Sequence, residues 1–147
     1  MLFIDKDVYT DPRFPLSRPE LEMIFAGLAE VFGLAESSVG LRIVDDQAMA
    51  LAHTQFMGCV GPTNILSFPA AENEHLGDMI LSADTLRREA FLYNQDTFSY
   101  TVRLLAHGFL HLLGYDHGPE MDAATDQAVE TLCLMPAADP GRLFASL

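Results

Sequence analysis

The stretch His107-Gly-Phe-Leu-His111-Leu-Leu-Gly114-Tyr-Asp-His117 decides how this chain folds around its most reactive side chains. Residues four apart on an α-helix share a face, so His107 and His111 can point at a common atom. Gly114 is the residue type that ends helices in a left-handed conformation, which lets the chain turn back and bring His117 to the same point. The pattern predicts a central buried helix that begins near Thr97, ends at this glycine and is followed by a loop.

Three imidazoles that converge from a helix and the loop after it leave a fourth position open, which is the arrangement of a catalytic zinc site. We predict that His107, His111 and His117 bind one zinc ion, although nickel, iron or copper also accept three imidazoles. Such a metal lowers the pKa of a bound water and would make the histidines catalytic, through that water, in hydrolysis of an ester, amide or phosphodiester. Buried histidines with structural hydrogen bonds are the alternative for these three, whereas His53 and His75, which lie outside the motif, are expected to be surface or capping residues rather than ligands.

Two neighbours of the histidines refine this prediction. Peptidases of the HExxH type carry a glutamate beside the first histidine as general base, but this chain has Gly108 there, which counts against a peptidase. Asp116 stands beside His117 and could orient a metal ligand by accepting its other N–H. A plain turn role for Asp116 is an equally good reading of the same sequence.

The composition indicates one globular domain over residues 1–147, because 147 residues with 50% hydrophobic content can bury a sizeable core. No apolar run is long enough to span a membrane, and the first residues lack the basic start of a signal peptide. The two cysteines, Cys59 and Cys133, have no metal-binding spacing. We expect two free thiols in a cytoplasmic protein, with one disulfide as the alternative.

The chain is strongly acidic, with eight basic residues against 21 acidic ones and a net charge of −13. Lysine and arginine contacts to phosphates supply most non-specific affinity for nucleic acid, so this charge alone argues against such a partner. A local positive patch is still compatible with it. Arg87, Arg88 and Arg103 are the basic residues in the segment that leads into the histidines.

The rest of the chain predicts short strands and helices around the motif helix. Strands are expected at 2–4, 39–44, 63–68 and 77–81, with Pro69 ending the third and a polar connection at 70–76. Besides the motif helix, helices are expected to run from the cap Ser17 to Gly33, from Asp45 or Asp46 to about 56, from Ser82 or Asp84 through 92, and over about 120–135. The predicted fold class is α+β: a mixed sheet of about four strands packed with about five helices, the metal site lying on the central helix and its following loop.

Three segments together resemble the YbeY family of bacterial endoribonucleases, the rRNA maturation factors. The first is the histidine motif, which matches HGxxHLxGYDH. Pro62–Pro69, with the sequence PTNILSFP, resembles the family's P-T-[DN]-V-L-S-F-P strand, and Leu76–Ile80 resembles its L-G-D-I-x-I segment. The order and spacing of the three agree, and the resemblance covers roughly residues 20 to 133.

The resemblance implies a zinc-dependent, single-strand-specific endoribonuclease that acts in 16S rRNA 3′-end maturation and ribosome quality control. It implies a cytoplasmic protein whose partners are rRNA and the ribosome or ribosomal proteins, without DNA or a membrane. It also implies that the three motif histidines are the metal ligands. Four further residues match strand and turn positions that we expect beside the substrate cleft: Asn64, Ser67, Phe68 and Asp78.

The chain departs from the family in the loop before PTNILSFP. Met57 stands where relatives usually have an arginine, and the apolar run Cys59-Val60-Gly61 follows where they tend to carry lysine and aspartate. Together with the net charge, this departure favours one alternative, a ribosome-associated maturation factor whose metal is mainly structural. A zinc hydrolase of another substrate, such as a peptide or small ester, is the second alternative.

Overall fold

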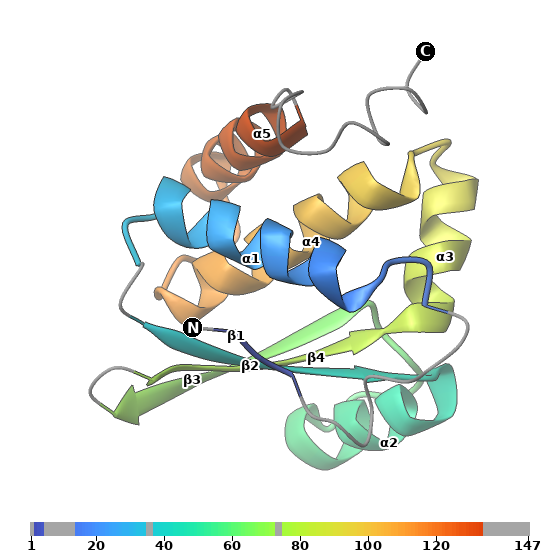
Figure 1. Ribbon diagram of the computed structural model, residues 1–147. Helices are drawn as coiled ribbons and strands as arrows, with labels where there is room; N and C mark the ends of the chain where they lie inside the picture. Colours follow the sequence, from blue (N-terminus) through green and yellow to red (C-terminus); the bar gives the residue numbers. More distant parts are fainter. Residues whose placement is uncertain (1, 5–13, 35–36, 73–74, 134–147) are drawn as a thin grey trace.

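The computed structural model describes residues 2–4, 14–34, 37–72 and 75–133, and it has the predicted α+β architecture of helices packed on a mixed sheet (Figure 1). In chain order the elements are β1 (Leu2–Ile4), α1 (Arg18–Val31), β2 (Ser38–Val44), α2 (Asp46–Met57), β3 (Ile65–Glu72), β4 (His75–Ser82), α3 (Ala83–Leu92), α4 (Thr97–Leu112) and α5 (Pro119–Cys133).

The sheet has the strand order β1-β2-β4-β3. Its body is formed by β2, β4 and β3, and the three-residue β1 pairs with β2 at the opposite edge from β3. The β1–β2 and β2–β4 pairs are parallel and the β3–β4 pair is antiparallel, which makes the sheet mixed. Figure 1 shows α1, α4 and α5 on one side of the sheet and α2 on the other.

Helix α4 is the central buried helix, as the histidine motif predicted. Eleven of its 16 residues are buried, so most of its circumference is covered by other elements. The ring of Phe109 packs against Phe25 and Phe32 of the α1 segment, at centroid distances of 5.3 and 6.2 Å. The side chain of Asp96 caps the helix by accepting a hydrogen bond from the Ser99 N–H at 3.0 Å. The core therefore holds α4 between the sheet, α1 and α5.

The predicted helix starts are confirmed in detail. Ser17 forms a reciprocal capping box with Glu20, and Asp45 accepts a hydrogen bond from the Ala48 N–H at 2.8 Å. For the third helix the sequence left two candidates, and the structure selects Ser82, whose hydroxyl accepts from the Thr85 N–H at 3.2 Å. Short polar side chains before an apolar helical pattern thus predicted these boundaries correctly.

The strand β3 runs further than predicted, because Pro69 does not end it. The N–H of Ser82 donates to the carbonyl of Asn64 at 2.9 Å, and hydrogen-bonded pairs recur at every second residue of an antiparallel ladder. Pro69, five residues after Asn64, is opposite Gly77 in a non-bonded pair, so its nitrogen faces away from β4. Since β3 is an edge strand, a proline in this position removes no ladder hydrogen bond.

The polar connection predicted for residues 70–76 is correspondingly wrong for most of its length. Residues 70–72 continue β3, and β4 begins at His75 rather than at Gly77. The polarity of this segment reflects an edge hairpin, because one face of an edge strand can be solvated. The predicted end of the last helix at residue 135 lies outside the described residues, which follow α5 to Cys133.

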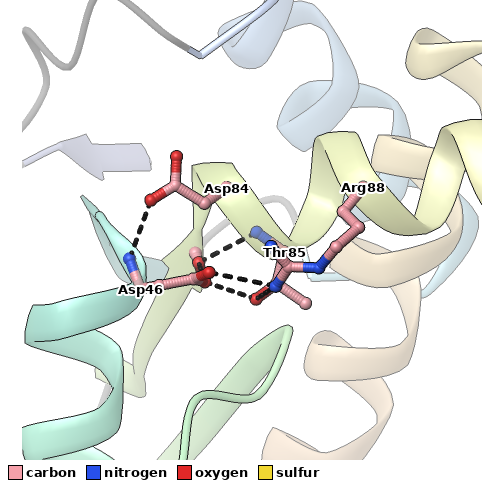
Figure 2. A network of polar contacts seen from close by, with 5 residues as sticks. Asp46, Asp84, Thr85 and Arg88 are labelled. Atoms are coloured by element: carbon pink, nitrogen blue, oxygen red, sulfur yellow. Dashed lines mark hydrogen bonds and ion pairs between the residues drawn. The ribbon is translucent and has the colours of Figure 1, made fainter.

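A network of polar contacts joins the N-termini of α2 and α3 (Figure 2). The carboxylate of Asp46 accepts hydrogen bonds from the hydroxyls of Ser82 at 2.8 Å and Thr85 at 2.6 Å, and it pairs with Arg88 at 3.0 Å. The backbone N–H of Asp46 donates to the carboxylate of Asp84 at 3.0 Å. The network links α2, on one side of the sheet, to the helix that follows β4.

The same contacts set the ionisation of Asp46. Partial burial alone would raise its pKa, but the hydrogen bonds from Thr85, Ser82 and Arg88, together with the charge of Arg88, outweigh burial and lower the pKa below 3.8. Asp46 is therefore ionised at neutral pH, and as a charged acceptor it holds together the N-termini of α2 and α3, a contact referred to below as the joint.

Two predictions from composition concern the molecule as a whole. Both cysteines are free thiols, Cys59 exposed and Cys133 partly buried. Among the helices of the described residues, none combines the length and the apolar character needed to cross a bilayer.

Candidate metal centre

The structure brings the three motif histidines together. Candidate ligand atoms of His107, His111 and His117 all lie within 4.8 Å of one another. The Nε2 atoms of His107 and His111 are 3.1 Å apart. Tetrahedral zinc, with Zn–N bonds of about 2.0–2.1 Å, separates its ligand nitrogens by about 3.3 Å. The donor set and its spacing therefore fit a divalent metal ion held by imidazoles.

The end of α4 is built to return the chain to the first two histidines. Gly114 has φ +94°, in the region that favours glycine. The N–H of Tyr115 donates to the Leu110 carbonyl at 2.9 Å, and that of Gly114 to the His111 carbonyl at 3.0 Å. These are the paired bonds of a Schellman motif. The chain that leaves this motif carries His117 back to the open side of the helix end.

The same turn orients the ring of His111. The carbonyl of Tyr115 lies 3.1 Å from Nδ1 of His111. A carbonyl only accepts, so this contact assigns the ring proton to Nδ1 and leaves the Nε2 lone pair directed toward His107. Asp116, for which the sequence left a ligand-orienting role and a plain turn role open, lies exposed beside His117. The sequence did not point to the Tyr115 carbonyl, because a backbone carbonyl leaves no residue-type signal.

Electrostatics keep His107 neutral. Burial, followed by the neighbouring charges that His111 and His117 would carry, lowers the pKa of His107 to about 4, and Asp122 on α5 opposes this shift. A metal ligand must present an unprotonated nitrogen, so at neutral pH this histidine is already in the form that binds metal. The contribution of Asp122 also shows that the start of α5 lies next to the site.

Gly108 lies where α4 presses on the sheet. A Cβ atom there would overlap the Sδ of Met79 and would stand 2.9 Å from Cδ1 of Ile65 and 3.2 Å from Oγ of Ser67. A larger side chain at this position would have to displace the side chains of Met79 and Ile65. The packing around Gly108 therefore disfavours the glutamate that an HExxH peptidase carries at this position.

Two of the four residues expected beside the cleft, Ser67 and Asn64, are linked by hydrogen bonds to α4 at different points along its length. Ser67 donates its hydroxyl to the carbonyl of Gly108 at 3.1 Å, directly beneath the motif. Asn64 donates to the carboxylate of Glu89 at 3.0 Å, which also accepts from the hydroxyl of Tyr100 at 2.9 Å. Tyr100 precedes His107 by seven residues, or about 10 Å along the helix axis. Asn64 therefore braces the start of α4, whereas Ser67 braces the site.

The other two residues, Phe68 and Asp78, are on the opposite face of the sheet. Successive side chains of a strand alternate between faces, and Ser67 and Met79 point to α4. Phe68 accordingly packs on Phe56 of α2, with ring centroids 5.2 Å apart. Asp78 contacts Nε2 of His75 at 3.3 Å. The structure does not bring either residue to the histidines.

The remaining histidines are also separate from this cluster. Nδ1 of His53 lies 2.9 Å from the carbonyl of Gly61, and Nδ1 of His75 lies 2.8 Å from the hydroxyl of Ser38. Both rings thus have hydrogen-bonding partners outside the cluster of three histidines.

The fold and the site together define a class: an α+β protein with a candidate three-histidine metal centre at the end of its central helix. The family model of Endoribonuclease YbeY matches residues 17–135. The chain belongs to the YbeY family.

Individual relatives agree with this assignment. The chain is 39% identical to Endoribonuclease YbeY of Nitratidesulfovibrio vulgaris, in an alignment covering 88% of this chain and 93% of that one. It is 37% identical to Endoribonuclease YbeY of Oleidesulfovibrio alaskensis, over 86% and 89% of the two chains. The solution structure of TM1509 from Thermotoga maritima has the same fold, with a TM-score of 0.64 and 24% identity over 90% of this chain and 89% of the other.

Proposed function

We propose that this protein is a metal-dependent, single-strand-specific endoribonuclease that acts in 16S rRNA 3′-end maturation and ribosome quality control. The observation that carries the proposal is the convergence of His107, His111 and His117 in a member of the YbeY family. The relatives named Endoribonuclease YbeY support RNA as the substrate. We further propose that the chain acts in the cytoplasm with the ribosome, and that residues 1–147 form one hydrolase-like domain.

Zinc is the metal that we propose for the site, since three imidazoles with a fourth position open are its usual catalytic ligand set. When bound, it supplies a Lewis acid and a water of lowered pKa for attack on a phosphodiester. The protein's own contribution is preorganisation. His107 is held neutral, the Tyr115 carbonyl fixes the ring of His111, and Ser67 holds α4 on β3.

In this proposal the ring-orienting role belongs to the Tyr115 carbonyl rather than to Asp116, and Asn64 acts only by bracing α4 through Glu89. Phe68 and Asp78 take no part in the histidine site, because they lie on the far face of the sheet. Of the substrates that a metal-activated water can attack, peptides are disfavoured. The position that holds the peptidase general base is Gly108, where a side chain would collide with Met79 and Ile65 of the sheet.

The test is the substitution His111→Ala, with His53→Ala as the matched control that removes a histidine outside the cluster. We expect His111→Ala to lose bound zinc, measured by elemental analysis, and to cleave precursor 16S rRNA at least about a hundredfold more slowly. The control should keep both properties. RNA cleavage that persists in metal-free His111→Ala protein would contradict the proposal.

A second candidate is a ribosome-associated maturation factor whose metal is mainly structural. Its specific support is the end of α2 and the loop after it, where apolar Met57 is 52% exposed and Val60 is 96% exposed, in place of cations that would attract RNA. Under this alternative, a folded His111→Ala protein would restore rRNA processing in cells that lack the wild-type protein. Rescue by the wild type alone would exclude it.

A further inference from the structure

We propose that Arg103 binds a phosphate of the RNA substrate beside the metal centre and supplies the cation that the loop at Met57 lacks. The inference rests on the proposed function and adds to it a substrate-binding residue of this chain. Its starting point is the sequence of α4, in which Arg103 is the only basic residue other than the two histidines. The packing of the sheet, α1 and α5 around α4 determines where this side chain lies.

Arg103 is on the same face of α4 as the motif histidines. It precedes His107 by four residues, and His111 follows by four more, so the three side chains form a row along the helix. One helical turn separates Arg103 from His107, about 6 Å along the axis. A long arginine side chain can therefore reach a phosphate adjacent to one held at the histidines.

This row lies on the open flank of the helix. Gly108 faces the sheet and Phe109 faces Phe25 of α1, and each residue turns the helix by about 100°. His107 consequently faces away from α1. Arg103, one turn earlier, keeps 42% of its side chain exposed to solvent, so a substrate can contact it without rearrangement of the core.

Helix α5 runs alongside the same flank. The Nη1 atom of Arg103 pairs with the carboxylate of Asp126 at 2.9 Å, and Asp122, one turn earlier on α5, acts on His107. The two spacings match, so Arg103 and His107 both lie beside α5. The ion pair holds the guanidinium in place, and because arginine carries five N–H donors, pairing through Nη1 leaves others for a phosphate oxygen.

Other arginines of the described residues serve different parts of the fold. Arg18 pairs with Glu22 on α1, and Arg88 pairs with Asp46 at the joint of α2 and α3. In an acidic protein, a single arginine next to the reacting phosphodiester has a large effect on where RNA can bind. The acidic neighbours of Arg103 then confine binding to this short row.

The experiment compares zinc-loaded wild type with Arg103→Gln and with Arg18→Gln, which removes the same charge and an exposed ion pair from α1. Steady-state cleavage of precursor 16S rRNA is measured between 50 and 200 mM NaCl, and zinc content and thermal stability are measured for each protein. For Arg103→Gln we expect KM to rise about fivefold with little change in kcat. The slope of log(kcat/KM) against log[NaCl] should become shallower by about 0.7, the value for one phosphate contact on a single strand.

Arg18→Gln should match the wild type, and Asp126→Asn, which frees Arg103 from its partner, should lower KM. If Arg103→Gln has the KM and salt slope of Arg18→Gln, the inference is overturned. Loss of zinc, or a fall in kcat at unchanged KM and slope, overturns it as well, by showing a structural role. RNA left uncleaved by the zinc-loaded wild type would overturn the proposed function itself, and this inference with it.

Discussion

At the scale of single residues, Gly108 shows how closely the site is built onto the sheet. Gly108 lies between His107 and His111 in the sequence. Its own position nevertheless faces the side chains of Met79, Ile65 and Ser67 on the sheet. The absence of a side chain lets α4 approach the strands, and the short distance in turn allows the Ser67 hydroxyl to reach the Gly108 carbonyl. A glycine inside a helix weakens it by about 1 kcal/mol relative to alanine, so packing here outweighs helix propensity.

We therefore predict that Gly108→Ala destabilises the protein by about 1–3 kcal/mol, although alanine is the better helix former. Urea unfolding gives the change in free energy. The control is Gly27→Ala on α1, where the added methyl would stand 3.0 Å from Cγ and Cδ2 of Leu132. Leu132 is only partly buried and can move aside, whereas Met79 is buried against Gly108. Gly27→Ala should therefore be neutral or stabilising, and equal effects of the two substitutions would refute this account of Gly108.

The residue scale also shows what sequence spacing can and cannot predict. The i, i+4 pair and the glycine turn placed His107, His111 and His117 correctly, because helix geometry alone decides which side chains share a face. The Tyr115 carbonyl was missed because main-chain groups have no residue code. Phe68 and Asp78 were expected near the site from their place in a motif, but strand alternation directs them to the other face.

At the scale of elements, the joint between α2 and α3 depends on one carboxylate. Asp46 connects two helix N-termini that lie 36 or more residues apart in the sequence, through Ser82, Thr85 and Arg88. Helix caps are local and could be predicted from the chain, whereas this contact depends on tertiary placement and could not. The same limit explains the hairpin of β3 and β4, since only the pairing register shows that Pro69 is harmless.

For Asp46→Asn we predict a loss of about 1–2 kcal/mol at pH 7, from the hydrogen bonds to the charged carboxylate. The folded pKa of Asp46 is below its usual 3.8, so its stabilisation is full above the unfolded pKa and is lost as the pH falls through the folded value. The difference between wild type and variant in urea unfolding should thus shrink below about pH 4.

The comparison variant is Arg88→Met, which removes only the half-exposed partner and should lose less than about 1 kcal/mol. A difference between wild type and Asp46→Asn that stays constant from pH 7 to pH 3 would show that ionisation of Asp46 does not stabilise the joint.

At the scale of the whole molecule, a net charge of −13 opposes both compaction and the approach of RNA. The fold class could be predicted from composition and periodicity. Half of the residues are apolar, and because they recur at strand and helix spacing, the elements must bury them in a core. Where the few cations lie relative to the histidines could not be predicted in that way. It depends on how α5 packs beside α4 and holds Arg103 through Asp126.

Salt should consequently stabilise the free protein. Raising the ionic strength from 0.01 to 0.15 M shortens the screening length from about 30 to about 8 Å, which reduces repulsion between surface carboxylates. We expect a gain of about 1 kcal/mol in the free energy of unfolding at pH 7, measured by urea titration. Near pH 4, where many carboxylates are protonated, the gain should disappear, and a gain of equal size at both pH values would rule out charge repulsion as its cause.

The position of Pro69 has a consequence for the behaviour of the protein in a crowded solution. A free sheet edge offers unpaired N–H and C=O groups to the strands of other molecules, and such pairing is a route to aggregation. In β3 the row of outward-facing N–H and C=O groups is interrupted at the middle of the strand, because Pro69 has a ring in place of the N–H donor. Pro69 removes no hydrogen bond within the sheet, but it hinders the addition of a further strand from a second molecule. It thereby helps to keep other chains from pairing with the sheet edge beside a site that RNA must reach.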